Sequence, residues 1–585
     1  MLSHYQYNVR ALDEAVRTVL RTQCVDEYAP FYGAIEQVEK GYTGAHSAIG
    51  AARQLLEGFY TPESAFYRDA RLLARIEIAV RFALSMQHED GTFDLLETNF
   101  HDGAETSFIM QNIGPAILLM RSRMENTPEE KNLYELLVHL VDRCADGILA
   151  SGFHTPNHRW VLSAALALCS ELTGREDCLV KMRALLNEGI DCDEEGEYTE
   201  RSSGVYNVIC DRALITLAQL RGMTELYAHV ARNLRMIFKY IEPDWTINTI
   251  NSTRQDVGTA PDWRIYYSIY LYMALQTGDE EFRWMADRML EQSQGQLLLD
   301  EERASRRELA YFEFMPFWEM DARLRNEWTA DGTRAPSFDY VKHFVRSGIV
   351  RARRGNFSLT LLEKRPVFAM MQFGGHTAYF RLAGTFYAHG QFAADAIEET
   401  KDGFLLTYRR RWGYKGPLPE KPATTDWNEM DHSKRPDVMM QDFVFNVHVR
   451  LLENGASFHV TTEGVECVLT KFEILLQPGA RYATGDMEMR AHGGDYVYQK
   501  GDAAFYQYAD HTKLRIEGGC WKHSFGEKMR NSLQVGDEIV TAGGIVGRVV
   551  SLREDTLLIE TGSNNTKMRI KRWAVQSCET IHDDV

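Results

Sequence analysis

The segments HRWVLSAALALCSEL (158–172) and FVFNVHVRLLE (443–453) have different hydrophobic periods, and this difference decides the fold. In the first segment apolar residues recur at three- and four-residue spacing, as they do in an amphipathic helix. In the second segment apolar and polar residues alternate, as they do in a half-buried strand. The sequence therefore predicts an α+β protein in which a helical part precedes a strand-rich part.

The helical period extends over the first half of the chain, to about residue 325. Further segments with this spacing are 66–88, 107–124, 129–150, 206–220, 225–241, 263–276 and 281–294. Roughly ten helices joined by alternating short and elaborate loops predict either a superhelical repeat array or a closed (α/α) toroid. Because no sequence repeat of fixed period is found, we predict that residues 1–330 form a toroid and hold the catalytic site.

The alternating period begins beyond about residue 340. It recurs in segments 356–364, 376–384, 404–412 and 457–476. Runs of helices followed by runs of strands indicate separate layers or domains, and they disfavour a parallel βαβ sheet. Residues 340–525 are therefore predicted to form an antiparallel β-sandwich.

Residues 528–585 have short Val- and Ile-rich segments separated by Gly543, Gly544 and Gly547, which predict a small β-barrel-like domain. Within it, GDEIVTAGGIVGRVV (536–550) resembles the soluble part of an auxiliary subunit of the bacterial preprotein translocase. That family carries a membrane helix ahead of this part, and the preceding residues of this chain contain none. A translocase role is therefore not expected.

The net charge of the chain limits the classes of partner that it can bind. A net charge of −18 argues against broad capture of nucleic acid or of an anionic membrane. An acidic polysaccharide or oligosaccharide could bind only in a groove where local Arg, His and Asn side chains outweigh the repulsion from the negative net charge of the chain. We therefore expect no nucleic-acid and no membrane partner, while a homo-oligomer remains open.

The cysteines and histidines give no sign of a metal or cofactor. The nine cysteines are odd in number and contain no CxxC pair, which disfavours a disulfide framework and a cysteine zinc site. No HExxH-like set is present. The sequence predicts neither a metal nor another cofactor.

The N-terminal segment MLSHYQYNVRALDEAVRTVL carries acidic residues where a secretory signal would need an unbroken apolar run. No later window offers about 18 uninterrupted apolar residues. The chain as written is therefore expected to be cytoplasmic, unless a signal peptide has been removed.

Polar side chains gather in HTPNHRW (154–160), directly ahead of a predicted helix. Asn157 could simply cap that helix, and Trp160 could pack into its core. The alternative is functional, because an amide, an imidazole, a guanidinium and an indole stand side by side. Asn157, His158, Arg159 and Trp160 would together suit an acidic sugar.

Two further polar segments precede predicted helices. GEYTERSSGVY (196–206) places Tyr206 at a helix start, where its hydroxyl could enter a cleft or its ring could cover the core; Tyr198 competes for the same role. NTINSTRQD (248–256) contains Arg254, which could bind a substrate carboxylate or brace Asp256.

Two histidines complete the candidates. His376 follows a glycine pair at a strand edge, where a ligand can approach the backbone closely, although a lone strand histidine is more often structural. His101, in the connector NFHDGAE (99–105), is a possible substrate-binding residue.

The order of these segments resembles the heparinase II/III and alginate-lyase type of polysaccharide lyase. The resemblance rests on Asn157-His158, on GEYTERSSGVY, on the Arg254 loop and on the β part that follows, and it spans residues 1 to about 525. It implies β-elimination on glycans that contain uronic acid.

The residue types suit that chemistry. Removal of the C5 proton of a uronate is hard because the neighbouring carboxylate is already negative, and a hydrogen-bond donor on that carboxylate stabilises the developing enolate. Asn157 is the predicted donor, helped by His158 and Arg254. Tyr206 is the predicted acid/base, with His158 or His376 as the alternative base. Predicted to bind substrate are Arg159, Trp160, Tyr198, Arg254 and His101.

Two other functions stay open. A toroidal glycoside hydrolase acting on uronyl oligosaccharides would use two carboxylates instead of Asn and Tyr, and its candidates are Asp90, Asp94, Asp102 and Glu105. A noncatalytic scaffold would bind glycan through the toroid and a partner through the tail.

Overall fold

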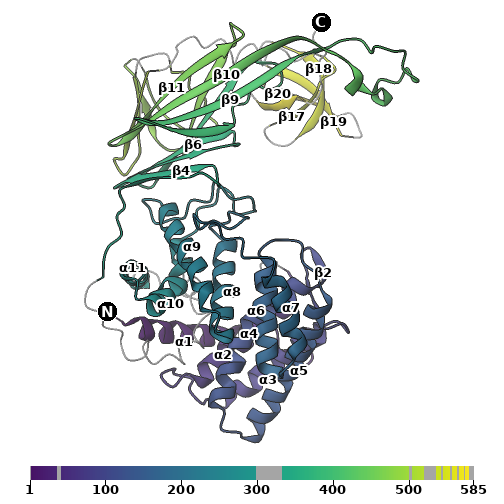
Figure 1. Cartoon of the computed structure of the whole chain (residues 1–585), viewed down its shortest axis with the longest axis vertical. Helices are drawn as coiled ribbons and strands as arrows, with labels where there is room; N and C mark the ends of the chain where they lie inside the picture. The colour runs from purple at the N-terminus through teal and green to yellow at the C-terminus, as the bar shows by residue number, and fades with distance from the viewer. Residues whose placement is uncertain are drawn as a thin grey trace. The chain divides into compact units, whose positions relative to one another are not determined.

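The computed structural model divides into two compact units, Met1–Thr360 and Leu361–Val585 (Figure 1). It describes residues 2–35, 41–297, 333–485, 487–499, 503–518, 535–541, 545–553, 556–562, 566–571 and 574–578. The predicted domain boundaries at residues 330 and 528 lie outside these residues.

The helices of unit 1 alternate with loops along its whole described length. They are α1 (His4–Thr22), α2 (Ala45–Tyr60), α3 (Arg71–Met86), α4 (Gly103–Arg123), α5 (Pro128–Ala150), α6 (His158–Thr173), α7 (Glu176–Leu186), α8 (Tyr206–Arg221), α9 (Tyr227–Tyr240), α10 (Tyr267–Thr277) and α11 (Glu280–Leu297). All eight segments for which a helical period was noted overlap one of these helices. The prediction of a helical N-terminal part is confirmed.

The helices contact one another in a circuit that returns to its start. From α2 it runs through α4, α6 and α8 to α10, then through α11 and α1 back to α2. The extent to which a helix is buried depends on its place in this arrangement. Every residue of α6 from Trp160 to Ser170 is buried, whereas α3 buries only one stripe, formed by Leu72, Ile76, Ala79, Val80 and Ala83. A helix that is buried all round lies inside a helical assembly, and a one-sided helix covers it.

The loops ahead of α4, α6, α8 and α10 carry the candidate residues His101, Asn157, Tyr198 and Arg254, respectively. Ahead of α4 lies a hairpin of β1 (Phe93–Leu95) and β2 (Asn99–Asp102). The loops ahead of α8 and α10 contact each other, because Ser203 Oγ donates to the carbonyl of Asn248 at 2.8 Å and Thr253 N donates to the carbonyl of Glu200 at 3.2 Å. The starts of these helices are thereby brought together.

A buried ion pair fixes the loop ahead of α10. Unit 1 ends in the antiparallel strands β3 (Tyr340–Phe344) and β4 (Ile349–Arg354), after which β5 (Phe357–Leu362) crosses the unit boundary. Arg351 lies 2.9 Å from Glu242, and both side chains are almost fully buried. Asn248 Nδ2 donates to the same Glu242 carboxylate at 2.7 Å. Loss of one partner of such a buried pair typically costs about 3–5 kcal/mol, so this loop is held firmly.

Unit 2 consists of antiparallel strands. β6 (Val367–Phe373) and β12 (Thr470–Leu476) flank β7 (His376–Gly384). A second sheet has the order β11-β10-β9-β8, formed by β8 (Ala396–Thr400), β9 (Gly403–Lys415), β10 (Asp437–Leu452) and β11 (Gly455–Gly464). The ring of Phe458 in the second sheet lies 4.8 Å from Phe380 and 6.0 Å from Phe368 in the first. The two sheets therefore pack against each other through aromatic side chains, and the prediction of antiparallel sheets is confirmed.

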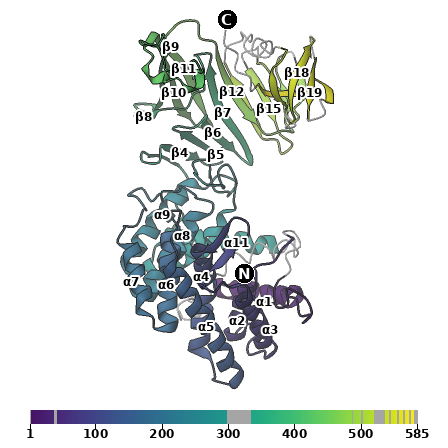
Figure 2. The same cartoon turned by 90° about the vertical axis from the view of Figure 1, so that its right-hand side faces the viewer.

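Two smaller sheets complete unit 2. The first, of order β14-β13-β15-β16, comprises β13 (Arg481–Ala483), β14 (Glu488–Arg490), β15 (Ala503–Gln507) and β16 (Lys513–Glu517). The second, of order β20-β19-β18-β17-β21, comprises β17 (Glu538–Thr541), β18 (Val546–Leu552), β19 (Thr556–Thr561), β20 (Thr566–Lys571) and β21 (Val575–Cys578); β18 and β19 are labelled in Figure 2.

The last sheet has a small apolar core of its own, formed by Ile539, Val549, Leu557 and Ile559. In the described part of the chain β20 and β21 are its edges, so closure into a barrel is not observed and stays a prediction. Gly543 and Gly544 lie outside the described residues.

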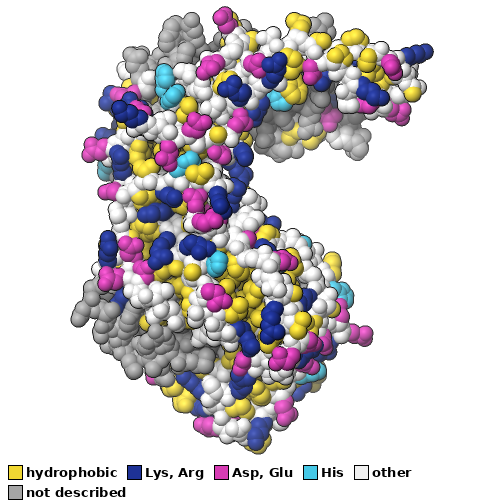
Figure 3. Space-filling model, in the orientation of Figure 1, with side chains coloured by type: hydrophobic (Ala, Val, Ile, Leu, Met, Phe, Trp, Pro, Cys, Tyr) yellow, Lys and Arg dark blue, Asp and Glu magenta, His cyan; other side chains and the backbone are white. Residues whose placement is uncertain are grey.

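Surface charges of both signs are interspersed on the face shown in Figure 3, in keeping with the many ion pairs of the structure. Among the described helices none combines the length and apolarity that a membrane crossing requires. The cysteines at positions 24, 144, 169, 178, 192, 210 and 467 are free thiols.

Candidate functional site

Asn157 lies immediately ahead of α6, but its side chain does not cap the helix. Its Nδ2 donates to Glu200 Oε2 at 2.6 Å, and a longer bond of 3.3 Å reaches Thr155 Oγ1. The residue is 1% exposed, and its Oδ1 has no hydrogen-bond partner among the described residues. The amide is thus turned toward the loop ahead of α8.

Glu200 joins Asn157 to the loop ahead of α10. Its Oε1 lies 3.3 Å from Arg254 Nε, and only 6% of its side chain is exposed. Burial raises the pKa of the Glu200 carboxyl, while the Asn157 bond and the Arg254 charge oppose that rise. Arg254 therefore faces Glu200; Asp256 accepts instead from Ser252 Oγ at 2.5 Å.

Tyr206 is the first residue of α8, and its half-buried phenol adjoins this pair. The guanidinium of Arg254 lies 5.2 Å from the ring centroid, within the range of a cation–π contact. Gln255 Nε2 donates to Tyr206 Oη at 2.6 Å. Asn157, Glu200, Arg254 and Tyr206 thus form one connected cluster, which we call the amide–tyrosine cluster.

His158 lies beside this cluster and is 8% exposed. The rings of His154 and Phe108 lie 4.9 Å and 6.1 Å from its ring, and its Nδ1 finds no hydrogen-bond partner in the described part of the chain. Burial lowers the pKa of His158 to about 4, and the charges of His154 and Arg254 act in the same direction. At neutral pH the imidazole is therefore uncharged.

The depressed pKa of His158 predicts a pH dependence of stability. Between its ordinary value of 6.5 and about 4, the unfolded chain binds a proton that the folded protein does not. The free energy of unfolding should therefore fall by up to about 3 kcal/mol as the pH falls through this window. Urea unfolding across that range is expected to show a weaker pH slope for His158→Gln than for the wild type. Parallel slopes in the two proteins would contradict the assignment.

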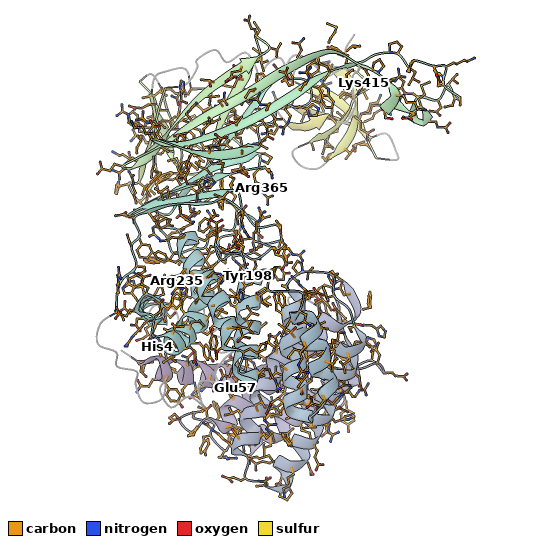
Figure 4. All side chains as sticks on the ribbon, in the orientation of Figure 1. His4, Glu57, Tyr198, Arg235, Arg365 and Lys415 are labelled. Atoms are coloured by element: carbon orange, nitrogen blue, oxygen red, sulfur yellow. The ribbon has the colours of Figure 1, made fainter. Side chains whose placement is uncertain are left out.

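The loop ahead of α8 also carries two buried polar residues, Glu197 and Tyr198. Glu197 accepts from Asn207 Nδ2 at 3.2 Å and from Tyr240 Oη at 3.0 Å, and burial raises its pKa to about 7. Tyr198, labelled in Figure 4, is 2% exposed and donates to Asp211 Oδ1 at 2.9 Å. Burial raises the pKa of the Tyr198 phenol well above its usual range. Tyr198 therefore has a bracing position in this structure, away from solvent.

Arg159 and Trp160 follow Asn157 and His158 in sequence but face elsewhere. Trp160 is fully buried, and its Nε1 donates to Asp191 Oδ1 at 2.8 Å. The Arg159 guanidinium lies 4.5 Å from the Trp160 ring and donates to Glu188 at 3.2 Å. Neither side chain joins the amide–tyrosine cluster.

The two remaining histidine candidates are each held by a carboxylate. His101 Nδ1 lies 2.6 Å from Asp90, and its ring stacks on His88 at 3.9 Å. His376, on β7 in unit 2, lies 3.0 Å from Asp510 and stacks on Tyr508 at 3.6 Å. Of the residues proposed from sequence, the structure brings together Asn157, His158, Tyr206 and Arg254.

The four carboxylates considered for a hydrolase are also engaged. Asp90 faces His101, and Asp94 lies 2.7 Å from His88. Asp102 accepts from the first backbone N–H groups of α4, and Glu105 lies 2.8 Å from His46. Among the described residues no group of three or more His, Cys, Asp or Glu side chains is placed to hold a metal ion.

Sequence reasoning assigned no role to Glu200, Gln255 or His154. All three lie inside the polar segments noted from sequence. Glu200 could have been suspected because an acidic residue sits between two candidate tyrosines at a helix approach. Nothing in the sequence pointed to Gln255 as the hydrogen-bond donor to Tyr206.

Residues 524–579 match the YajC family, described as a preprotein translocase subunit. The Sec translocon accessory complex subunit YajC of Thermotoga maritima is 37% identical over 51 residues, which cover 9% of this chain and 43% of that protein. The chain thus spans less than half the length of this curated relative. The predicted resemblance of the C-terminal segment is confirmed.

Solved structures similar to this chain include three polysaccharide lyases. A xanthan lyase from Paenibacillus is 10% identical with a TM-score of 0.49, covering 87% of this chain and 51% of its own. A heparan sulfate lyase from Pedobacter heparinus is 10% identical with a TM-score of 0.42, covering 88% and 90%. A chondroitin AC lyase from Streptomyces coelicolor is 12% identical with a TM-score of 0.42, covering 96% and 84%. At these identities and TM-scores no residue role carries over to this chain.

Proposed function

We propose that the protein is a polysaccharide lyase that cleaves glycans containing uronic acid by β-elimination, with its active site in a helical toroid. The observation that carries the proposal is the amide–tyrosine cluster. A buried amide, a guanidinium and a partly exposed phenol are joined within hydrogen-bond or cation–π distance. These three groups are what carboxylate neutralisation and proton transfer require.

In the proposed reaction Asn157 binds the uronate carboxylate. Its Nδ2 donates to Glu200 at 2.6 Å, and the weaker 3.3 Å bond to Thr155 Oγ1 is the one that a substrate carboxylate can replace without turning the amide. Hydrogen bonding to the carboxylate disperses the charge that builds up when the C5 proton leaves. This is stabilisation of a developing oxyanion by a preorganised donor.

Tyr206 moves the proton. Its Oη, as the phenolate, takes the proton from C5; the C5–H electron pair forms the C4=C5 double bond, and the C4–O4 bond breaks with its electron pair left on O4. The same phenol then returns a proton to O4 of the leaving sugar. Arg254, 5.2 Å from the ring centroid, supplies a positive charge beside the oxygen that becomes negative. His158, which is uncharged and whose Nδ1 accepts from none of the described residues, is the alternative base within unit 1, and His376 is the alternative in unit 2.

Glu200 is a positioning residue in this scheme. It holds the Asn157 amide and the Arg254 guanidinium at the same time. Its own negative charge would oppose a uronate carboxylate. Arg254 offsets that charge, and the raised pKa of Glu200 makes it easier to neutralise by protonation.

The test is ultraviolet absorbance from the new C4=C5 double bond, followed while the protein is incubated with glycosaminoglycans, alginate and bacterial exopolysaccharides. We expect an increase on at least one of them, at a rate that a chelator does not change. Products with saturated non-reducing ends would establish the hydrolase instead. Glycan binding without any product would establish the scaffold, and a chelator-dependent rate restored by one metal would overturn the mechanism.

The C-terminal sheet is predicted to be dispensable for catalysis. The sheet formed by β17 to β21 has its own apolar core, and the amide–tyrosine cluster lies entirely in unit 1. A chain ending at residue 527 should therefore keep its turnover and the melting transition of unit 1. Calorimetry and the absorbance assay check this together. A folded truncation that has lost turnover would show that the tail takes part in the reaction.

A further inference from the structure

Two histidines face each other across neighbouring strands of unit 2. His448 on β10 and His459 on β11 are direct partners in the antiparallel register. β10 and β11 run side by side in Figure 1. Both side chains are exposed, and their ring centroids are 6.4 Å apart with the ring planes inclined by 47°. Side chains of directly opposed residues on antiparallel strands lie on the same face of the sheet.

Nothing in the described part of the chain engages either imidazole through a hydrogen bond or an ion pair. Polar residues on the same strands have other partners: Asn446 Nδ2 donates to Glu463 at 2.7 Å, and Arg450 lies 2.9 Å from Asp402. The contrast with the other histidines is clear, since His88, His101 and His376 each face an aspartate. His448 and His459 therefore keep their ring nitrogens available.

The spacing suits a shared metal ion. Imidazole nitrogens bind zinc at about 2.0–2.1 Å, so two rings on one tetrahedral ion have centroids about 5 Å apart. The observed rings need to approach by about 1 Å, which side-chain torsions can supply without moving the strands. Imidazole is a preferred ligand of zinc, nickel and copper and a poor one for magnesium and calcium.

We propose that His448 and His459 form a two-coordinate protein site for a divalent transition ion of this kind, with water in the remaining positions. The bound ion cross-links β10 and β11 through one histidine from each strand. No role in the elimination is assigned to it, because neither histidine belongs to the amide–tyrosine cluster, whose residues all lie in unit 1. This inference is independent of the proposed function.

The experiment uses the full chain with zinc and copper as probes. Zinc affinity is measured by calorimetric titration for the wild type, His448→Gln, His459→Gln and the control His492→Gln, which alters another exposed histidine of unit 2. Because the second ligand of a chelate binds intramolecularly, either site variant should lose roughly 100-fold in affinity, and the control should lose none. Zinc should raise the melting temperature of the wild type and the control only.

Copper supplies a spectroscopic signature. The electron paramagnetic resonance spectrum of the Cu²⁺-loaded wild type should show coupling to two nitrogens, and each site variant should show one. All three substitutions are on the surface, and circular dichroism checks that the variants fold. Equal zinc affinity in the wild type and both site variants would overturn the proposal, as would an equal loss in the control.

Discussion

Replacement of Tyr206 by phenylalanine is expected to lower turnover by roughly 100-fold or more, with little change in substrate binding. The substitution removes only the hydroxyl. The ring stays at the start of α8, where Arg254 lies 5.2 Å from its centroid. The one hydrogen bond lost is that from Gln255, whose side chain is exposed and can turn to water. The values of kcat and KM from the absorbance assay measure the two effects separately.

Tyr198→Phe is the matched control, because it removes another tyrosine hydroxyl from the same segment, residues 196–206. The change leaves the buried Asp211 carboxylate without its 2.9 Å donor, at a cost of roughly 1–3 kcal/mol of stability. We expect a lower melting temperature with turnover per folded molecule unchanged. Near-normal turnover in Tyr206→Phe would refute the assignment and would make His158→Gln and His376→Gln the next variants to measure.

The helical and β parts of the fold were predictable because burial imposes a period on the sequence. In α6 the apolar run from Val161 to Leu172 is interrupted by only a few small or polar residues, and it lies inside the helical circuit. In β10 the alternation of Phe445, Val447 and Val449 with more exposed positions marks the face that packs inward. Barrel closure was not predictable in the same way, because alternation indicates strands but does not say how the last strand pairs.

Adjacency in sequence was a poor guide to the composition of the site. Successive residues of a helix point about 100° apart, so Asn157, His158, Arg159 and Trp160 cannot share one face. The structure turns Asn157 toward Glu200 and turns Trp160 into the core, where Asp191 accepts its N–H. Of these four consecutive residues, Asn157 belongs to the amide–tyrosine cluster and His158 lies beside it.

The contacts of Glu200 could not be predicted from the sequence, because its partners are far from it along the chain. It lies 43 residues from Asn157 and 54 from Arg254, and its two contacts arise only when the loops ahead of α8 and α10 pack together. That packing depends on backbone bonds such as Thr253 N to the Glu200 carbonyl and on the buried Arg351–Glu242 pair. Neither contact has a local sequence signature.

Asn157→Ala is expected to lower turnover by roughly 100-fold, which corresponds to about 3 kcal/mol, the typical loss for one oxyanion-type donor. The helix start should be little affected, since the Asn157 side chain makes no capping bond. The loss could still act through Glu200, whose buried carboxylate would forfeit its 2.6 Å donor. Glu200→Gln separates the two routes, because it keeps the shape of the side chain and removes the charge.

The deciding measurement is therefore a double-mutant cycle of Asn157→Ala and Glu200→Gln, read in kcat and in melting temperature. If Asn157 donates directly to the substrate carboxylate, its removal should lower turnover by the same factor in the Glu200→Gln background as in the wild type. If Asn157 only holds Glu200 in place, the factor should shrink toward one once Glu200 carries no charge. The melting temperature tests a third explanation, in which the variants lose turnover only because they are less stable. A turnover loss that follows instability alone would vanish when both variants are assayed well below their transitions, and in that case the amide would have no part in the elimination.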